Sequence, residues 1–520
     1  MFVEIKIDNE DIKGKIYNIS EQGFKVISDK SIPISRKIDY LITLPDKKYV
    51  QGKGRIIWIL EKSIKEFCYG IIFIKWNEEY DADMFNEYLN NISSNKKIDE
   101  RRDKFERRKN NLGTPEDKRK IERRLVKGVF RKCINSKIVH EFLSQEKICF
   151  FRELSTASAD RIIINKKEMI NLGSNNYLGL TTHPKVKEAA IKAIEKYGTG
   201  SGGVRILSGT LDLHNQLEYK LAKFKGGEDC VVYSTGYTTN IGTISGLLGK
   251  EDVVIIDEKA HASIIDGCNL SGAELLIFNH NDMIDLEKKL KKYGEEKNKL
   301  IITDGVFSMD GDIAELDKIY ILAQEYNSAV MIDDAHATGV IGEKGKGTSE
   351  YFNLMGKIDI IGGTLSKALG SIGGFIAGNK KIIQYLKNTG SRSFLFTTSL
   401  PPSVSAGIIT AIDVIENEPE IRKQLWANIA FMKDGMKKLG FNIRNTESAI
   451  IPIIVGENKK TFKMTEMLGE KGVFVSSVVY PAVKRNESRL RISIMATHTL
   501  ADLEISLNAL EKAGKKIGII

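Results

Sequence analysis

The sequence reads AVMIDDAH at residues 329–336 and DIIGGTLSKALG at residues 359–370, and these two stretches decide the fold. Each is a short apolar run that ends in acidic, glycine or hydroxyl residues, and LIITD at residues 300–304 is a third run of the same kind. A helix-like pattern covers Leu316 to Tyr326. Short buried strands that alternate with helices are typical of a parallel sheet. We therefore predict an α/β fold built on such a sheet.

Four reactive side chains, those of Ser308, Asp333, His336 and Lys367, lie at the ends of these runs or just past them. Ligands of open α/β sheets bind beyond the carboxyl ends of the strands. A lysine there can form a Schiff base with an aldehyde when its surroundings suppress its protonation. A buried carboxylate that faces a pyridine nitrogen keeps that nitrogen protonated, so the ring becomes an electron sink. Each motif is common by itself, but together they predict a pyridoxal 5'-phosphate (PLP) site at Lys367 and Asp333.

Further motifs follow one another in a definite order. They are NLGSNNYLGL at 171–180, GTGSGGVR at 198–205, SGT at 208–210, STGY at 234–237, HASIIDG at 261–267, DGVFSMDG at 304–311 and RLRIS at 489–493. With these motifs, residues 130–520 resemble the α-oxoamine synthase family of fold-type I PLP enzymes. The resemblance implies a large, mostly parallel sheet domain and a small C-terminal α+β subdomain at about residues 415–520.

The resemblance assigns roles around the cofactor ring. His261 is similar to the histidine that stacks on the ring, where an imidazole can also handle protons. Asp333 would pair with the pyridine nitrogen. His336 and Ser308 would hydrogen-bond the phenolic oxygen of the ring.

A second group of residues would hold the phosphate. Gly236 and the backbone N–H of Tyr237 open a helix after the apolar run 230–233, and a helix N-terminus suits a phosphate. Thr364 resembles a further contact on the phosphate or lysine side. Thr397 and Thr398 match a segment that reaches the phosphate from the neighbouring subunit, which implies a homodimer with a shared active site.

The substrate side of the resemblance rests on Arg491, similar to the arginine that grips the amino-acid carboxylate with a planar two-donor fork. Arg489 is nearer a structural position, and Asn175 is a candidate for the substrate edge. The implied reaction is a decarboxylative condensation of glycine, alanine or serine with an acyl-CoA, giving an α-amino ketone, CO2 and CoA. Lys367 is the expected general base for the α-proton. No metal site is predicted.

Several alternatives stay open at this point. The motifs resemble 8-amino-7-oxononanoate synthases, glycine C-acetyltransferases and bacterial serine palmitoyltransferase-like enzymes alike, so the amino acid and the acyl chain are not chosen. An aminotransferase or lyase would share Lys367 and Asp333, although those enzymes typically stack an aromatic side chain where His261 stands. A non-catalytic signalling or partner subunit is the third possibility, but subunits of that kind have lost the lysine.

A different pattern occupies residues 1–92. Five strand-like runs, 14–19, 23–27, 40–44, 54–60 and 70–74, precede a helix-like stretch near residues 83–91, which predicts a small β-barrel. NISEQG at 18–23 and GIIF at 70–73 resemble a PilZ domain, the module that binds cyclic di-GMP. No arginine precedes Arg36, so the RxxxR half of the ligand motif is absent upstream. Guanine and phosphate recognition depends on arginine, so docking by a degenerate barrel is at least as strong an interpretation as nucleotide binding.

The stretch between the two predicted domains, residues 93–129, is dense in charge. Residues 96–124 hold thirteen basic and seven acidic residues, a net +6 out of +10 for the chain. Alternating signs with few aromatic residues favour a helical linker over a nucleic-acid site. The five cysteines show no CxxC pair, and no leader or membrane-length apolar run is visible, so we expect a cytoplasmic protein.

Overall fold

The computed structural model describes the backbone of six strands between Phe2 and Trp76, and residues 150–294 and 296–520. The chain divides into two compact units, Met1–Val139 and His140–Ile520, and each is described by itself. The predicted helix near residues 83–91 and the predicted linker at 93–129 lie outside the described residues. The exact domain boundaries therefore stay predictions.

The strands of the first unit pair antiparallel in the order β1-β2-β3-β6-β5-β4, and β1 also pairs with β4. All five predicted runs coincide with strands of this set, whereas β1, with the alternating sequence FVEIKI, was not predicted. The bounds are β1 Phe2–Ile7, β2 Glu10–Ser20, β3 Gly23–Ser28, β4 Lys37–Thr43, β5 Tyr49–Ser63 and β6 Glu66–Trp76.

The second unit is built on a seven-stranded sheet with the order β11-β10-β12-β13-β14-β15-β9. Only β15 runs antiparallel to its neighbours, so the predicted mostly parallel sheet is confirmed. Strands β10, β12 and β14 are buried along their whole length, and β13 is buried after its first residue, as their apolar runs indicated. The bounds are β9 Asp229–Tyr233, β10 Val253–Asp257, β11 Glu274–Phe278, β12 Lys299–Asp304, β13 Ala329–Asp333, β14 Ile360–Thr364 and β15 Gly374–Gly378.

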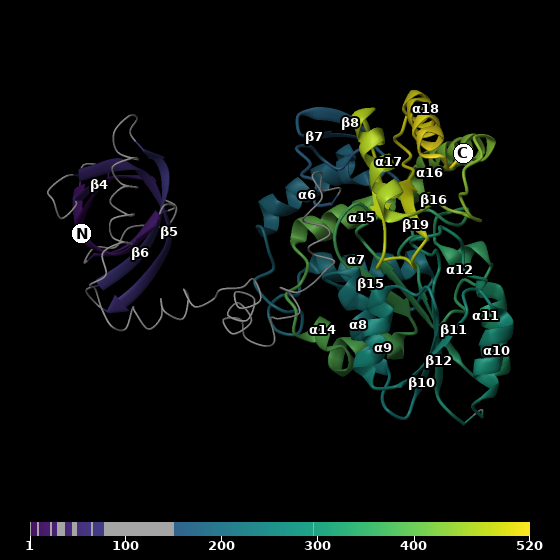
Figure 1. Ribbon diagram of the computed structural model, residues 1–520. Helices are drawn as coiled ribbons and strands as arrows, with labels where there is room; N and C mark the ends of the chain where they lie inside the picture. The colour runs from purple at the N-terminus through teal and green to yellow at the C-terminus, as the bar shows by residue number, and fades with distance from the viewer. Residues whose placement is uncertain are drawn as a thin grey trace, which may run out of the picture. The chain divides into compact units, whose positions relative to one another are not determined.

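Helices cover both faces of this sheet (Figure 1). Along β10, Val254 and Ile256 pack with residues of α8 and α9, while Val253 and Ile255 pack with residues of α10 and α11. This alternation follows from the two-residue repeat of a strand and produces three layers. The helices are α6 Pro184–Tyr197, α7 Asp212–Lys225, α8 Gly236–Leu247, α9 Ala262–Ser271, α10 Met283–Lys291, α11 Leu316–Glu325, α12 Thr348–Tyr351, α13 Lys380–Tyr385, α14 Arg392–Leu395 and α15 Pro402–Asn417, with a 3-10 turn at Leu180–Thr182 and a π turn at Leu386–Gly390.

The elements after Asn417 form an α+β set, which agrees with the expected small C-terminal subdomain. A three-stranded antiparallel sheet in the order β16-β19-β18 carries Arg491 on its middle strand, and a further small sheet has the order β17-β8-β7. The bounds are α16 Pro419–Lys438, β16 Ile450–Gly456, α17 Asn458–Glu470, β17 Val473–Phe474, β18 Ser476–Val478, β19 Ser488–Ser493, α18 Leu500–Ile517, β7 Arg161–Ile164 and β8 Lys167–Asn171. Each helix within the described residues is too short or too polar to cross a bilayer.

Candidate active site

The ends of three neighbouring strands bring the predicted ring-binding residues together. Asp304 at the end of β12 lies opposite Asp333 at the end of β13, and Asp333 lies opposite Gly362 of β14. Lys367 follows the end of β14 at Thr364. Because parallel strands end at the same sheet edge, these three side chains share one site.

The Lys367 amine is tuned for reaction near neutral pH. Burial lowers the pKa of Lys367 from 10.5 to about 7, the nearby Arg491 charge also lowers it, and Asp333 and Asp304 only partly oppose this. Loss of hydration penalises the ammonium form more than the neutral amine. A substantial fraction of the side chain is therefore nucleophilic at pH 7.

Both carboxylate oxygens of Asp333 are held in place. The Asn240 Nδ2 amide on α8 donates to Asp333 Oδ2 at 2.7 Å, and the backbone N–H of Ala335 donates to Oδ1 at 2.9 Å. Asp333 is buried, so its orientation is set by these bonds and not by water. A buried carboxylate held in this way suits the expected role beside a pyridine nitrogen.

Asp304 belongs to the same site, and sequence reasoning missed it. Its Oδ2 accepts a hydrogen bond from the backbone N–H of His261 at 3.0 Å. Burial, followed by the neighbouring charge of Asp333, raises the pKa of Asp304 well above 3.8. Its position at a strand end next to Asp333 was the available signal.

His261 stands immediately before α9, at the entrance of the site. Its Nδ1 lies 2.7 Å from Ser263 Oγ and 3.3 Å from the Ser263 backbone nitrogen. His261 is an exposed residue, yet nearby protein atoms displace enough water from its ring that lost hydration lowers the pKa of His261 below 6.5. Its ring centroid lies 6.1 Å from that of Tyr237.

His336 belongs to a buried hydrogen-bond group that includes Tyr177. Its Nδ1 is 2.7 Å from the hydroxyl oxygen of Tyr177, which is fully buried. Burial, and then the charges of Lys367 and Arg491, lower the pKa of His336 well below 6.5. Tyr177 also donates to Asn175 Oδ1 at 3.2 Å. Tyr177 is a second residue that sequence reasoning passed over, although it stands inside the motif that contains Asn175.

The Arg491 guanidinium is buried without a carboxylate partner among residues 150–294 and 296–520. It donates to Ser308 O at 2.6 Å, to Asn175 Oδ1 at 2.9 Å and to Ser493 Oγ at 2.9 Å, all of them neutral oxygens. Arg489, two residues earlier on β19, is instead paired with Asp310 at 2.6 Å and Glu487 at 3.2 Å. The predicted division between a substrate arginine and a structural arginine agrees with these contacts.

The start of α8 has the features expected of a phosphate-binding helix N-terminus. The first-turn N–H groups of a helix have no partner within the helix, which makes this end suitable for an anion. Gly236 begins α8, and a Cβ added there would lie 3.0 Å from Cβ and Oγ1 of Thr364. Thr364 Oγ1 itself contacts Ser366 Oγ at 2.8 Å. Thr364 therefore lies against Gly236 in the first turn of α8, where Gly236 has no side chain and Tyr237 follows it.

Two of the predicted cofactor ligands, Thr397 and Thr398, lie beside Ser234, just before the start of α8. The backbone of Thr398 bridges to Val204, and its carbonyl accepts a hydrogen bond from Ser234 Oγ at 3.1 Å. No hydrogen bond joins Thr397 or Thr398 to Lys367 among the described residues. Their predicted function depends on a neighbouring subunit and stays a prediction.

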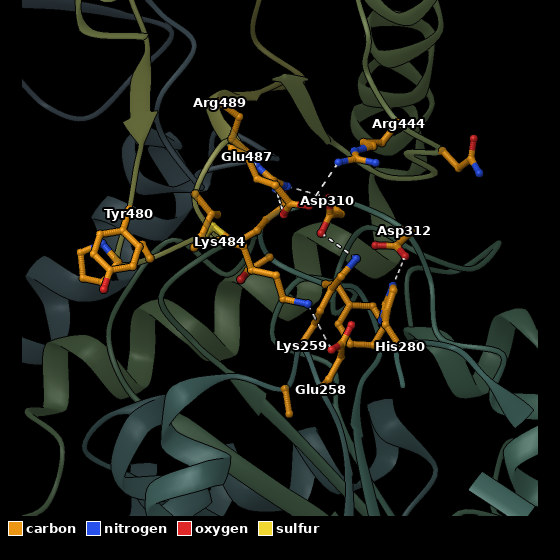
Figure 2. A pocket seen from close by; sticks show the side chains of 18 residues that line it. Glu258, Lys259, His280, Asp310, Asp312, Arg444, Tyr480, Lys484, Glu487 and Arg489 are labelled. Atoms are coloured by element: carbon orange, nitrogen blue, oxygen red, sulfur yellow. Dashed lines mark hydrogen bonds and ion pairs between the residues drawn. The ribbon is translucent and has the colours of Figure 1, made fainter. Parts of the chain in front are cut away.

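A pocket of about 740 Å³ adjoins the site at Ala260 and Ser308. Figure 2 shows that charged side chains lining this pocket form ion pairs with one another, among them Lys259 with Asp310 and His280 with Asp312. Burial would lower the pKa of His280, but Asp257 and Asp312 raise it to about 9. The pocket therefore offers space for a substrate, and the charges of its lining side chains are largely paired with one another.

These residues fit PLP by their chemistry. A weakly basic, half-buried lysine, a buried carboxylate with fixed oxygens, and a helix N-terminus that begins with glycine match the aldehyde, the pyridine nitrogen and the phosphate in turn. The unpaired Arg491 matches a carboxylate of a further ligand.

Comparisons with known proteins agree with this chemistry. Residues 167–510 match the family Aminotransferase class I and II, and residues 1–90 match the PilZ domain. The chain is 48% identical over 368 residues to an 8-amino-7-oxononanoate synthase from Thermoanaerobacter pseudethanolicus, covering 71% of this chain and 93% of that protein. It is 44% identical over 382 residues to a serine palmitoyltransferase from Sphingobacterium spiritivorum, covering 74% and 96%.

Solved structures give the same result. A serine palmitoyltransferase variant from S. paucimobilis with bound PLP and myriocin superposes with a TM-score of 0.73 at 35% identity, covering 75% of this chain and all of that one. An 8-amino-7-oxononanoate synthase from Francisella tularensis has a TM-score of 0.59 at 28% identity, covering 67% and 98%.

The pKa of Lys367 predicts how cofactor capture depends on pH. When apoprotein is mixed with PLP and reduced with borohydride, the rate of covalent attachment at Lys367 should rise with pH around a midpoint of about 7, because only the neutral amine reacts. Peptide mass spectrometry locates the adduct, and Lys367→Ala is the control without it. A midpoint near 10 would contradict the assignment.

The raised pKa of Asp304 predicts a cost to stability at neutral pH. The unfolded carboxyl ionises near 3.8 while the folded one keeps its proton longer, so stability falls as pH rises from 3.8 towards the folded pKa. Asp304→Asn should therefore raise the thermal midpoint of the apoprotein at pH 7, and the gain should shrink as pH falls towards 4.

Asp310→Asn is the matched control for this measurement. Burial favours its neutral form, but Arg489 and Lys259 outweigh burial and hold the pKa of Asp310 below 3.8. Asp310→Asn should accordingly lower the thermal midpoint at pH 7. A lower midpoint in both variants would show that Asp304 is ionised in the folded protein.

Proposed function

The chain belongs to the α-oxoamine synthase family within aminotransferase class I and II, with a PilZ domain at residues 1–90, and from this premise we propose which of its residues perform the reaction. It is a PLP-dependent acyltransferase that condenses a small amino acid with an acyl-CoA and releases CO2 and CoA. The observation that carries the residue assignment is the buried Arg491 guanidinium, which lies beside Lys367 and has no carboxylate partner among the described residues.

The cofactor would be held at three points. Lys367 binds its aldehyde carbon, Asp333 faces its pyridine nitrogen, and Gly236, Tyr237 and Thr364 contact its phosphate. His336 and Ser308 would serve the phenolic oxygen. When bound, PLP supplies an electron sink for the electrons left at the amino-acid α-carbon.

Arg491 would bind the amino-acid carboxylate. A guanidinium that is buried without an anion is costly, and a carboxylate ligand restores the missing charge pair. Asn175 already accepts from Arg491 Nη1, so it would orient the arginine fork at the substrate edge. This places the α-carbon of the amino acid near the amine of Lys367.

Lys367 would then move the proton at that α-carbon. An amine with a pKa of about 7 accepts and returns a proton with little driving force in either direction at neutral pH. His261, at the open side of the site, would donate a hydrogen bond to the thioester carbonyl or to the carboxylate. A histidine in this position distinguishes the site from aminotransferases and lyases that stack an aromatic ring.

A second subunit would complete the site. In the family that the chain belongs to, the segment that Thr397 and Thr398 match reaches the phosphate of the neighbouring subunit. We therefore propose a homodimer with a shared active site.

For the first unit we propose the small PilZ-like β-barrel that its antiparallel strand order favours. Cyclic di-GMP binding and protein docking are its two candidate roles. The absence of arginine before Arg36 favours docking. A cytoplasmic location is proposed from the unpaired pattern of the five cysteines.

Release of CoA thiol from a panel of substrates tests the reaction. Glycine, alanine and serine are each combined with acetyl-, pimeloyl- and palmitoyl-CoA, and release should require both an amino acid and a thioester, because the carbanion forms before condensation. The panel also identifies the preferred pair. CoA release without an amino acid would indicate a thioesterase and contradict the proposal.

Arg491→Ala should raise the KM for the amino acid by roughly 10- to 150-fold, because a lost charge-assisted hydrogen bond costs about 1.5–3 kcal/mol. The KM for the acyl-CoA should change little. Arg161→Ala is the matched control, since Arg161 lies on β7 and its guanidinium is already paired with Glu168 and Asp502. Unchanged amino-acid saturation in Arg491→Ala would mean that the carboxylate is held elsewhere.

A further inference from the structure

A continuous set of hydrogen bonds joins Asp333 to His261 through two residues that the proposed reaction does not use. Asn240 Nδ2 donates to Asp333 Oδ2 at 2.7 Å and to Ser263 Oγ at 2.9 Å. Ser263 Oγ lies 2.7 Å from His261 Nδ1. Asn240 and Ser263 are both buried, at 3% and 0% exposure, so water does not compete for these bonds.

The direction of each hydrogen bond follows from chemistry. The Ser263 backbone N–H can only donate, and it lies 3.3 Å from His261 Nδ1, so Nδ1 accepts. The two hydrogens of the Asn240 amide are used by Asp333 and Ser263, so Ser263 Oγ is an acceptor there and directs its own hydrogen to Nδ1. The proton of the neutral imidazole must then be on Nε2.

Close packing of two helices makes the connection possible. Asn240 lies on α8 and Ser263 on α9, one turn before Gly267. A Cβ added at Gly267 would lie 3.0 Å from Cβ of Ile244 and 3.1 Å from the Asn240 carbonyl oxygen. Glycine thus permits the approach that lets the Asn240 side chain reach across to Ser263.

We propose that Asn240 and Ser263 are positioning residues that hold the His261 ring at the cofactor face with its proton on Nε2, ready to donate to the bound substrate. The backbone of His261 is held separately, by the hydrogen bond to Asp304. His261 is therefore connected to the end of β12 through its backbone and to the end of β13 through its ring. The inference rests on the proposed function only in placing His261 in the site.

A double-mutant cycle tests whether Ser263 acts through His261. Ser263→Ala is made in the wild-type and His261→Gln backgrounds, and both the PLP dissociation constant of the apoprotein and kcat for CoA release are measured. In the wild type, Ser263→Ala should lower kcat about tenfold and weaken PLP binding. A change of this size is within the range of coupling energies between residues of one hydrogen-bond network. In His261→Gln, Ser263→Ala should change either quantity by less than about twofold.

The control and the opposite outcome are equally definite. Ser245→Ala removes a hydroxyl from α8 whose one hydrogen bond among the described residues goes to Ile241 O at 2.6 Å, and it should leave both quantities unchanged. An equal loss from Ser263→Ala in both backgrounds would show that Ser263 acts independently of His261 and would overturn the proposal. The PLP cycle decides this even if acyl transfer is not the reaction.

A measurement on the wild-type chain guards against a variant that fails to fold. With ¹⁵N-labelled histidines, the signals lost in His261→Gln identify this ring among the seven histidines. Nδ1 should resonate as an unprotonated nitrogen and Nε2 as a protonated one. A protonated Nδ1 at neutral pH would refute the inferred tautomer.

Discussion

Two buried carboxylates and a half-buried lysine lie together at the ends of three adjacent parallel strands, and the cost of removing their charges from water governs the site. Asp304 and Asp333 cannot both be ionised cheaply in a place where water is scarce. The structure resolves this by giving Asp333 two hydrogen-bond donors, whereas Asp304 receives a single backbone N–H and has a raised pKa. The same scarcity of water lowers the pKa of Lys367 to about 7. The scarcity of water thus affects both the Asp333 carboxylate and the Lys367 amine.

The two arginines of β19, Arg489 and Arg491, are also buried charges whose surroundings differ. Arg489 and Arg491 project to one face of the strand, yet within the described part of the chain acidic partners are found for Arg489 alone. Arg491 is surrounded by neutral oxygens and reaches His336 through Tyr177, whose hydroxyl lies 3.4 Å from Nη2. Arg491 and His336 therefore belong to one hydrogen-bond group.

Much of this arrangement could be predicted from the sequence, because it depends on where strands end. The apolar runs marked β12, β13 and β14, and their common edge placed Asp333 beside Lys367. What could not be predicted depends on contacts between segments far apart in the chain. The link from Asn240 to Ser263 requires the spacing of two helices, and the neutralisation of Arg489 requires Asp310, 179 residues away. The missed Asp304 is the intermediate case, because its strand end was recognised but its proton depends on the neighbouring charge.

The small sheet β17-β8-β7 links the beginning of the described catalytic unit to its last fifth. Val473 of β17 pairs with Ile170 of β8, and Arg161 pairs with Asp502 across 341 residues. Contacts of such long sequence separation form late, since the intervening chain must be ordered first. During synthesis, the loop that carries Asn175 has to wait for residues near 474 to emerge from the ribosome. The edge of the site that carries Asn175 is therefore completed after the strand ends that carry Asp304 and Asp333, so a partly made chain would order the two edges one after the other.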